Sequence, residues 1–342
     1  AICRANLWLR TADRIKVQVA SFKAKTFDEL FEKTKAINWR SFIPENGKFP
    51  VIGKSVKSTL ASVPDCQRIV KKAIVEKLKL QSGKANDWIE ETGAEYKVEI
   101  SLLKDQALIT LDSSGTGLHK RGYRVDQGGA PIKETLAAAL VQLTNWTPDR
   151  PFVDPFCGSG TIAIEAALIG QNIAPGFNRD FVSEDWEWIG KDLWNKARLE
   201  VEEKANYDQP LTIFASDIDH RMVQIAKENA EEAGLGDLIQ FKQMQVKDFT
   251  TNLEFGVIVG NPPYGERLGE KKAVEQMYKE MGQAFEPLDT WSVYMLTSNE
   301  NFEEAYGRKA TKKRKLFNGF IKTDYYQYWS KVRPQRKKTE NA

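Results

Sequence analysis

The segment that most constrains the fold is PFVDPFCGSGTIAIEAA, which occupies residues 151–167. Its apolar start predicts a short strand ending near Val153, Gly158 and Gly160 predict a turn, and residues 161–169 have the pattern of an apolar helix. A glycine-rich turn between a strand and a helix lets a ligand approach the backbone closely, and the helix N-terminus favours polar or anionic groups. The segment therefore predicts a ligand site at this turn.

Acidic residues around the turn argue against a nicotinamide dinucleotide as the ligand. Residues 158–163 fit the pattern G-x-G-x-x-A, but that match is weak by itself. Asp154 precedes the glycines, where it would repel a pyrophosphate but could hold a cation such as an α-amino group. Asp217, the next acid at the end of a predicted strand, lies far beyond the usual spacing of about 20 residues. An adenosyl ligand with an amino-acid tail and no phosphate suits the turn better.

A second motif, NPPY at residues 261–264, directly follows the apolar run at residues 255–260. The side-chain oxygen of Asn261 can accept a hydrogen bond, and the two prolines fix the backbone and leave nearby carbonyls free to accept as well. Tyr264 offers a flat face for stacking. Together these groups suit a planar amine, such as an exocyclic base nitrogen or a carboxamide. A proline-rich turn that merely closes a strand is the alternative, and the glycine-rich motif upstream argues against it.

From about residue 126 the predicted strands and helices alternate, which indicates a parallel sheet. Ligands on such sheets bind beyond the carboxyl ends of the strands, where Asp154, Asp217, Asp248 and Asn261 all fall. The expected strands are residues 152–154, 212–216, 239–244, 255–260 and 292–297, with a final pair at 312–317 and 321–329.

The first part of the chain has a different, α+β pattern. A capping box at residues 26–29 opens one helix and Pro64 opens a second. A strand is expected at residues 49–52 and a hairpin at 96–103 and 106–111. Residues 170–210 are expected to be an insertion within the second domain, where Trp186, Trp188 and Trp194 pack a local core.

Charge is distributed unevenly along the chain. Residues 1–125 contain 23 Lys/Arg and 14 Asp/Glu, residues 126–307 contain 15 and 31, and residues 308–342 contain 12 and 2. An acidic core would repel a polyanion, whereas basic flanks such as residues 312–315 and 336–338 can neutralise phosphates. This distribution favours a nucleic acid as partner, although isolated lysines are also common on any solvated surface.

Several classes of protein are disfavoured. The three cysteines form no disulfide framework, the two histidines are too few for a metal centre, and we predict no bound metal. No signal peptide or long apolar span is evident, which favours a cytoplasmic protein that does not cross a membrane. We infer no obligate protein partner. Cys157 is expected to fill space in the turn rather than act as a nucleophile.

The motifs DPFCGSGT, ASDID, VKDF and NPPYGERL resemble those of the class I S-adenosylmethionine-dependent methyltransferases that modify exocyclic amines. The linker LHKRGYR followed by APIKETLAAAL is similar to the THUMP-domain RNA methyltransferases, and most to the bacterial branch that forms N2-methylguanine in 23S ribosomal RNA. The resemblance implies a Rossmann-like α/β domain with a mostly parallel seven-stranded sheet and an antiparallel edge hairpin, preceded by an α+β THUMP domain.

The resemblance also implies boundaries and roles. It places the THUMP domain at residues 1–118, with the end of a truncated ferredoxin-like segment at its start, then a linker at 119–135, the catalytic domain at 136–331 and a basic tail at 332–342. The implied catalytic residues are Asn261, Pro262 and Tyr264. The implied S-adenosylmethionine-binding residues are Glu134, Asp154, Phe156, Gly158, Gly160, Thr161, Asp217, Ile218 and Asp248.

Other functions remain open from the sequence. A transfer RNA guanine-N2 or adenine-N6 methyltransferase would use the same motifs. A protein glutamine methyltransferase also uses NPPY but needs no basic flanks, and a DNA adenine methyltransferase more often carries a DNA-reading module. An RNA-binding protein without catalysis is disfavoured because the cofactor motifs are intact.

Overall fold

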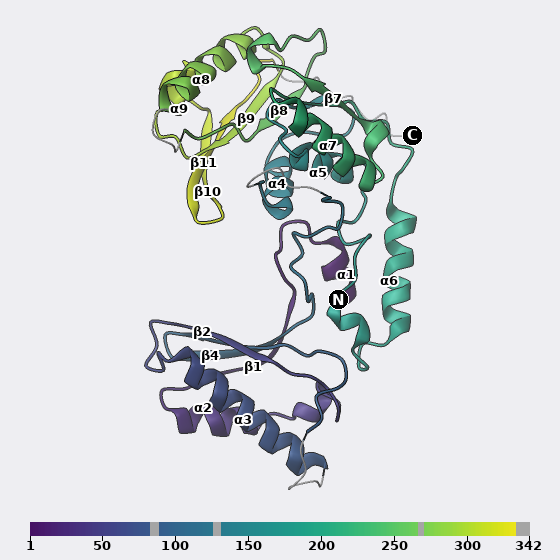
Figure 1. Cartoon of the computed structure of the whole chain (residues 1–342), viewed down its shortest axis with the longest axis vertical. Helices are drawn as coiled ribbons and strands as arrows, with labels where there is room; N and C mark the ends of the chain where they lie inside the picture. Colours follow the sequence, from purple (N-terminus) through teal and green to yellow (C-terminus); the bar gives the residue numbers. More distant parts are fainter. Residues whose placement is uncertain (83–88, 126–130, 266–269, 333–342) are drawn as a thin grey trace, which may run out of the picture. The chain divides into compact units, whose positions relative to one another are not determined.

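The computed structural model of the chain describes residues 1–82, 89–125, 131–265 and 270–332. These residues divide into two compact units (Figure 1). Unit 1 comprises Ala1–Leu118 and Gly176–Glu203, and unit 2 comprises His119–Pro175 and the chain from Lys204 onward. The end of the NPPYGER motif at residues 266–267, residues 126–130 of the expected linker and the expected basic tail beyond residue 332 lie outside the described residues.

Unit 1 is built on a four-stranded sheet with the order β1-β4-β3-β2, in which only β2 and β3 are parallel. The turn between β3 and β4 places Lys104 and Asp105 at positive φ (51° and 65°), the backbone that a tight two-residue hairpin requires. This hairpin confirms the sequence prediction. The strands are β1 (Lys16–Lys23), β2 (Val51–Val56), β3 (Val98–Leu103) and β4 (Gln106–Asp112).

Two helices of unit 1, α2 (Phe27–Lys35) and α3 (Val63–Ser82), pack against each other on one side of this sheet (Figure 1). The Thr26 hydroxyl accepts a hydrogen bond from the Glu29 N–H at 3.1 Å, as the predicted cap requires. The Glu29 carboxylate accepts from the Lys25 N–H at 2.8 Å. The shorter helical elements are α1 (Ile2–Trp8) and η1 (Trp39–Ser41).

Residues 176–203, which the sequence analysis placed inside the catalytic domain, group with unit 1 instead. The reason is aromatic packing: Trp186 stacks on Tyr96 with a ring separation of 5.2 Å, and its indole N–H donates to the Glu95 carbonyl at 2.8 Å. Trp194 stacks on Phe181 at 5.2 Å. This segment contains η2 (Val182–Asp185) and most of α6 (Lys191–Lys204).

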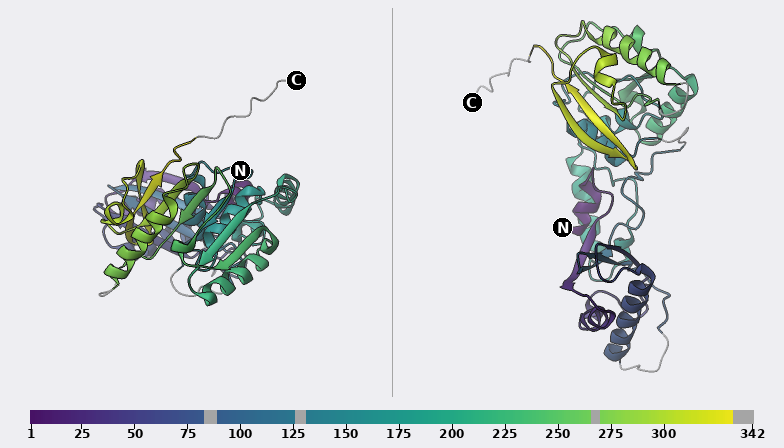
Figure 2. Two further views of the ribbon diagram at one scale, coloured as in Figure 1. Left: turned by 90° about the horizontal axis from the view of Figure 1, so that it is seen from above. Right: turned by 90° about the vertical axis from the view of Figure 1, so that its left-hand side faces the viewer.

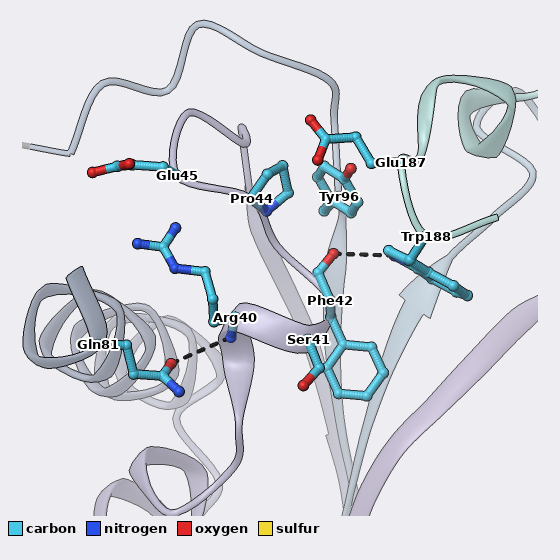
Figure 3. A pocket seen from close by; sticks show the side chains of 9 residues that line it. All are labelled: Arg40, Ser41, Phe42, Pro44, Glu45, Gln81, Tyr96, Glu187 and Trp188. Atoms are coloured by element: carbon cyan, nitrogen blue, oxygen red, sulfur yellow. Dashed lines mark hydrogen bonds between the residues drawn. The ribbon is translucent and has the colours of Figure 1, made fainter. Parts of the chain in front are cut away.

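Trp186 and Trp194 are buried, as expected, whereas Trp188 remains 39% exposed. The Trp188 indole N–H donates to the Phe42 carbonyl at 3.1 Å and its ring meets the Phe42 ring edge-on. Trp188 and Arg40 both line a hollow of about 450 Å³ in unit 1. Figure 3 shows how these side chains lie around it.

Unit 2 contains a seven-stranded sheet over the described residues, with the order β10-β11-β9-β8-β5-β6-β7 (Figures 1 and 2). Strands β5 to β9 are parallel, and β11 is antiparallel to both β9 and β10. This topology confirms the predicted fold class. The strands are β5 (Phe152–Asp154), β6 (Ile213–Asp217), β7 (Ile239–Gln243), β8 (Val257–Gly260), β9 (Ser292–Thr297), β10 (Lys312–Asn318) and β11 (Ile321–Tyr328).

Helices cover both faces of this sheet and form two apolar cores (Figure 1). On one face lie α4 (Glu134–Gln142), α5 (Thr161–Gly170) and α7 (His220–Glu232), and on the other lie α8 (Lys271–Phe285) and α9 (Phe302–Tyr306). Short 3₁₀ turns occur at η3 (Gly236–Leu238) and η4 (Val246–Asp248). Within the described ranges, none of the helices has the length and apolar composition that spanning a bilayer requires.

The packing of Trp186 predicts a large effect on stability. Trp186→Ala should lower the free energy of unfolding by about 3–5 kcal/mol, because it removes a fully buried ring and leaves the Glu95 carbonyl without its donor. Trp188→Ala, a matched control, should cost only about 1 kcal/mol because it removes a half-exposed ring and one hydrogen bond. Urea denaturation followed by circular dichroism would measure both, and equal losses would contradict this account.

Candidate active site

A cavity of about 950 Å³ lies in unit 2, lined by loops that follow the carboxyl ends of β5, β6, β7 and β8. Strand β5 pairs with β6 on one side and β8 on the other, so the chain builds outward in both directions from β5. Loops that leave β5 and β8 therefore diverge at this point, which opens a crevice for a ligand.

The glycine-rich loop between β5 and α5 forms one wall of the cavity. Gly160 caps α5 at φ +84°, and a Cβ there would lie 3.0 Å from the Cβ of Ala226 on α7. Buried Asn229, also on α7, donates from its side-chain nitrogen to the Ser159 carbonyl at 2.9 Å. Close packing on α7 thus fixes the loop and requires glycine at position 160.

Asp217, at the end of β6, is oriented by two backbone N–H groups. One carboxylate oxygen accepts from Gly158 at 3.0 Å and the other from Asp219 at 2.9 Å. Each oxygen keeps a second lone pair, and Asp217 belongs to the cavity wall. The next residue, Ile218, is 64% exposed and adds an apolar surface to the same wall.

Asp154, at the end of β5, is completely buried. One carboxyl oxygen accepts from the Phe156 N–H at 3.2 Å, and the other has no hydrogen-bond partner among the described residues. Burial raises the pKa of Asp154 to about 8. The hydrogen bond from Phe156 lowers this pKa, and the negative charge of Asp217 raises it by a smaller amount. A buried carboxyl with an unused oxygen matches a ligand that carries an ammonium group or another N–H donor.

The NPPY turn after β8 forms the opposite wall. The Tyr264 hydroxyl donates to the Asn261 side-chain oxygen at 2.6 Å, and the Asn318 amide donates to the Tyr264 hydroxyl at 3.3 Å. The Tyr278 hydroxyl donates to the Pro263 carbonyl at 2.7 Å, which anchors the turn to α8. The Asn261 oxygen is thereby held in one orientation and still has a lone pair for a ligand.

Glu134 lies in a buried ionic network beside the site rather than in the cavity wall. Its carboxylate pairs with Arg124 at 3.0 Å, and burial raises the pKa of Glu134, with the Arg124 charge opposing that rise. Arg124 donates to the Thr161 hydroxyl at 3.0 Å, and Arg121 pairs with buried Glu165 at 3.2 Å. This network ties the segment before α4 to the first residues of α5.

The structure brings most of the predicted residues together. The cavity wall includes Phe156, Gly158, Thr161, Asp217, Ile218, Asn261, Pro262 and Tyr264. Four others lie outside it: Glu134, Asp154, Gly160 and Asp248. Asp248 is exposed at the end of η4, and the three residues before it form the wall instead.

Sequence reasoning missed several wall residues. Met222 follows Asp219, whose side chain caps α7, so a helix-start signal was present. Met244 lies two residues before the recognised motif VKDF, and Lys247 lies within it. Asn318, the last residue of β10, carries no local motif and reaches the wall only through the order of the strands.

The chain matches two families of known proteins. Residues 121–327 match the family described as RMKL-like, methyltransferase domain, and residues 24–112 match the THUMP domain. These matches confirm the family that the motifs predicted.

Individual relatives agree with this. Ribosomal RNA large subunit methyltransferase K/L of Shewanella frigidimarina (strain NCIMB 400) is 32% identical over 95% of this chain and 46% of its own length. The chain thus spans about half the length of the curated relatives it matches.

Two solved structures are similar over most of their lengths. A Listeria monocytogenes str. 4b F2365 protein described as a predicted N6-adenine-specific DNA methylase is 64% identical, with a TM-score of 0.92 over 96% of this chain and 85% of that one. SMU.472, solved in complex with SAH, is 53% identical, with a TM-score of 0.93 over 96% and 87%. The chain belongs to the RMKL-like methyltransferase domain family and carries a THUMP domain before its methyltransferase domain.

Proposed function

We propose that this chain is an S-adenosylmethionine-dependent methyltransferase that modifies an exocyclic base amine of RNA, and that this amine is N2 of a guanine in 23S ribosomal RNA. The observation that carries the proposal is that Asn261 and Pro262 line the same cavity as Gly158 and Asp217. The name of the Shewanella relatives supports ribosomal RNA as the substrate.

The residues of the cavity fit S-adenosylmethionine. Asp217 can accept from the ribose hydroxyls, and Ile218 offers an apolar face to the adenine ring. Asp154 is buried outside the cavity wall but directly precedes the wall residues Pro155 and Phe156, and its unused oxygen suits the α-amino group. The binding of SAH by the similar protein SMU.472 supports this fit. When bound, S-adenosylmethionine supplies an electrophilic methyl group carried on a positively charged sulfur.

The NPPY turn then orients the substrate amine. The Asn261 oxygen and the Pro262 carbonyl accept from its N–H groups, which favours the tetrahedral nitrogen of the transition state over the planar ground state. Tyr264 provides a face for the base, and its hydroxyl keeps the Asn261 amide from rotating. Positioning rather than a strong base accounts for the catalysis, because the amine needs a fixed approach to the methyl group.

Charge supports RNA as the substrate. Residues 126–307, which form most of the cavity wall, hold 31 Asp/Glu and 15 Lys/Arg, so this part alone would repel a polyanion. Residues 1–125 and 308–342 carry an excess of Lys/Arg, and the first of these stretches contains the THUMP domain. RNA binding should accordingly weaken as salt is raised.

Adenine N6 is a second candidate, because the Listeria relative is described as an adenine-specific DNA methylase and adenine also presents an exocyclic amine. The two candidates differ in the product nucleoside. Labelled S-adenosylmethionine should be incubated with RNA from cells that lack this gene, with DNA and peptide as parallel substrates. Label in N2-methylguanosine from 23S RNA supports the proposal, label in N6-methyladenosine supports the second candidate, and label only in DNA or peptide refutes an RNA substrate.

Removal of the Asn261 amide should affect turnover but not cofactor binding. Asn261→Ala should lower kcat by about 10²–10³-fold, because it removes an acceptor that acts mainly in the transition state. The affinity for S-adenosylmethionine, measured by calorimetry, should stay unchanged. Asn206→Ala is the matched control, because Asn206 is an exposed amide of unit 2 outside the cavity wall. Unchanged turnover in Asn261→Ala would contradict the role of this residue.

The pKa of Asp154 predicts a pH dependence of cofactor binding. Asp154 is protonated below its pKa of about 8, and an ammonium group binds the carboxylate. Affinity for S-adenosylmethionine should therefore rise between about pH 6 and about pH 8, by at most about 10-fold per pH unit, with proton release on binding. In Asp154→Asn the affinity should be lower and independent of pH over this range.

The same pKa has a consequence for stability. Because the folded carboxyl holds its proton more tightly than the unfolded one, its contribution to stability is lost as the pH rises toward about 8. Asp154→Asn should flatten this part of the stability profile of the unliganded protein.

The affinity prediction has its own contradicting outcome. If the affinity of the wild-type protein for S-adenosylmethionine, measured by calorimetry, does not change with pH, the contact between Asp154 and the ammonium group is contradicted.

A further inference from the structure

The hairpin of β10 and β11 ends in two exposed aromatic side chains. Asn318 pairs with Ile321, so the turn consists of Gly319 and Phe320 alone. Gly319 has φ +63°, as the first position of a type II′ turn requires. Phe320 is 105% exposed and Phe317 is 64% exposed. Within β11, the residues that pair with β9 are 324–328, so the start of β11 is not paired with β9. Figure 1 shows the turn extending beyond β9.

This turn borders the cavity of the active site. Asn318, Gly319 and Ile321 belong to the cavity wall, whereas Phe320, between them in sequence, is fully in solvent. Asn318 also donates to the Tyr264 hydroxyl, which donates to the Asn261 oxygen. Hydrogen bonds thus connect the hairpin to the amide that is proposed to hold the substrate amine. Phe320 stands at the rim of the cavity.

Strand β10 carries positive charge along its length, away from this aromatic tip. Side chains alternate along the strand, so Lys312 and Arg314 share a face with Asn318. Both are exposed, and the described part of the chain shows no ion pair to either of them. Lys313 lies on the other face, where Glu303 pairs with it at 2.8 Å. Arg314 lies about 13 Å and Lys312 about 20 Å along the strand from Asn318, a span of several nucleotides.

Protection of the sheet edge explains only part of this arrangement. Lysines on an edge strand discourage pairing with another chain, and β10 is an edge strand. An exposed phenylalanine at the tip has the opposite effect, because it offers apolar surface for association. The turn itself requires glycine at position 319 but no aromatic residue at position 320. The ring therefore needs a separate explanation.

We infer that Phe320 stacks on an RNA base next to the target nucleotide, while Lys312 and Arg314 contact the phosphates of the same strand. The inference rests on the proposed function and names a positioning residue for it. A target base must leave its stack to reach the cavity, and a ring inserted beside the gap offsets part of that cost. A single ring on a two-residue turn is narrow enough to contact one base, whereas a protein partner would need a larger apolar surface.

The test compares variants of Phe320 in the full chain. Phe320→Ala should bind a short fluorescein-labelled single-stranded RNA about 10-fold more weakly in anisotropy titrations, as expected for the loss of one stacked base. Phe320→Trp should restore the affinity because it keeps an aromatic face. Tyr207→Ala is the matched control, since it removes another exposed aromatic ring of unit 2 that lies outside the cavity wall. Cofactor affinity should be the same in all of these variants.

A second readout separates stacking from a structural role. Methyl transfer to native RNA should fall more in Phe320→Ala than transfer to heat-unfolded RNA, because unstacking is already complete in the latter. Equal RNA affinity and equal transfer in Phe320→Ala and wild type would overturn the inference while leaving the proposed function intact. If the wild-type protein shows no methyl transfer to any RNA but RNA binding still weakens in Phe320→Ala, the proposed function is overturned and the stacking contact is supported.

Discussion

The hydrogen bond from the Gly158 N–H to the Asp217 carboxylate joins the two strand ends on which the site depends. It connects the loop after β5 to the end of β6, and Asn229 holds the same loop from α7. With the loop fixed, Asp217 presents its remaining lone pairs to the cavity. The NPPY turn follows β8, which is the other neighbour of β5. Both halves of the site are therefore positioned by strands that pair with β5.

The sequence predicted the parts of the fold that local patterns encode. Strands at residues 152–154 and 292–297 were placed at their observed limits because each is a buried apolar run between turn residues. Strand β1 was not predicted, since its residues alternate between half-buried and exposed and none is fully buried. The association of residues 176–203 with unit 1 was also missed, because it depends on Trp186 packing on Tyr96, a contact that no local pattern records.

The candidate site shows the same division. Asp217 and Asn261 could be found because Asp217 ends one apolar strand, Asn261 directly follows another, and parallel strands share their carboxyl edge. Asn318 could not be found, because its contact with Tyr264 requires β11 to pair with β9 and β10 to pair with β11. Asp248 stood in a recognised motif, yet the wall is formed by the residues just before it. Strand ends are set locally, whereas the direction of a side chain in a short turn is set by packing.

The electrostatics of the site separate ligand binding from chemistry. The carboxyl with the strongly raised pKa, Asp154, lies on the side of the glycine loop, whereas the groups proposed to act on the amine are an amide and a backbone carbonyl that do not titrate. A general base would need a titratable group within reach of the amine. The proposed acceptors need only a fixed orientation, which Tyr264, Asn318 and Tyr278 supply through hydrogen bonds. We expect pH to act on this site by changing the fraction of protein that has cofactor bound. We expect the geometry of the acceptors to act by changing the rate of methyl transfer.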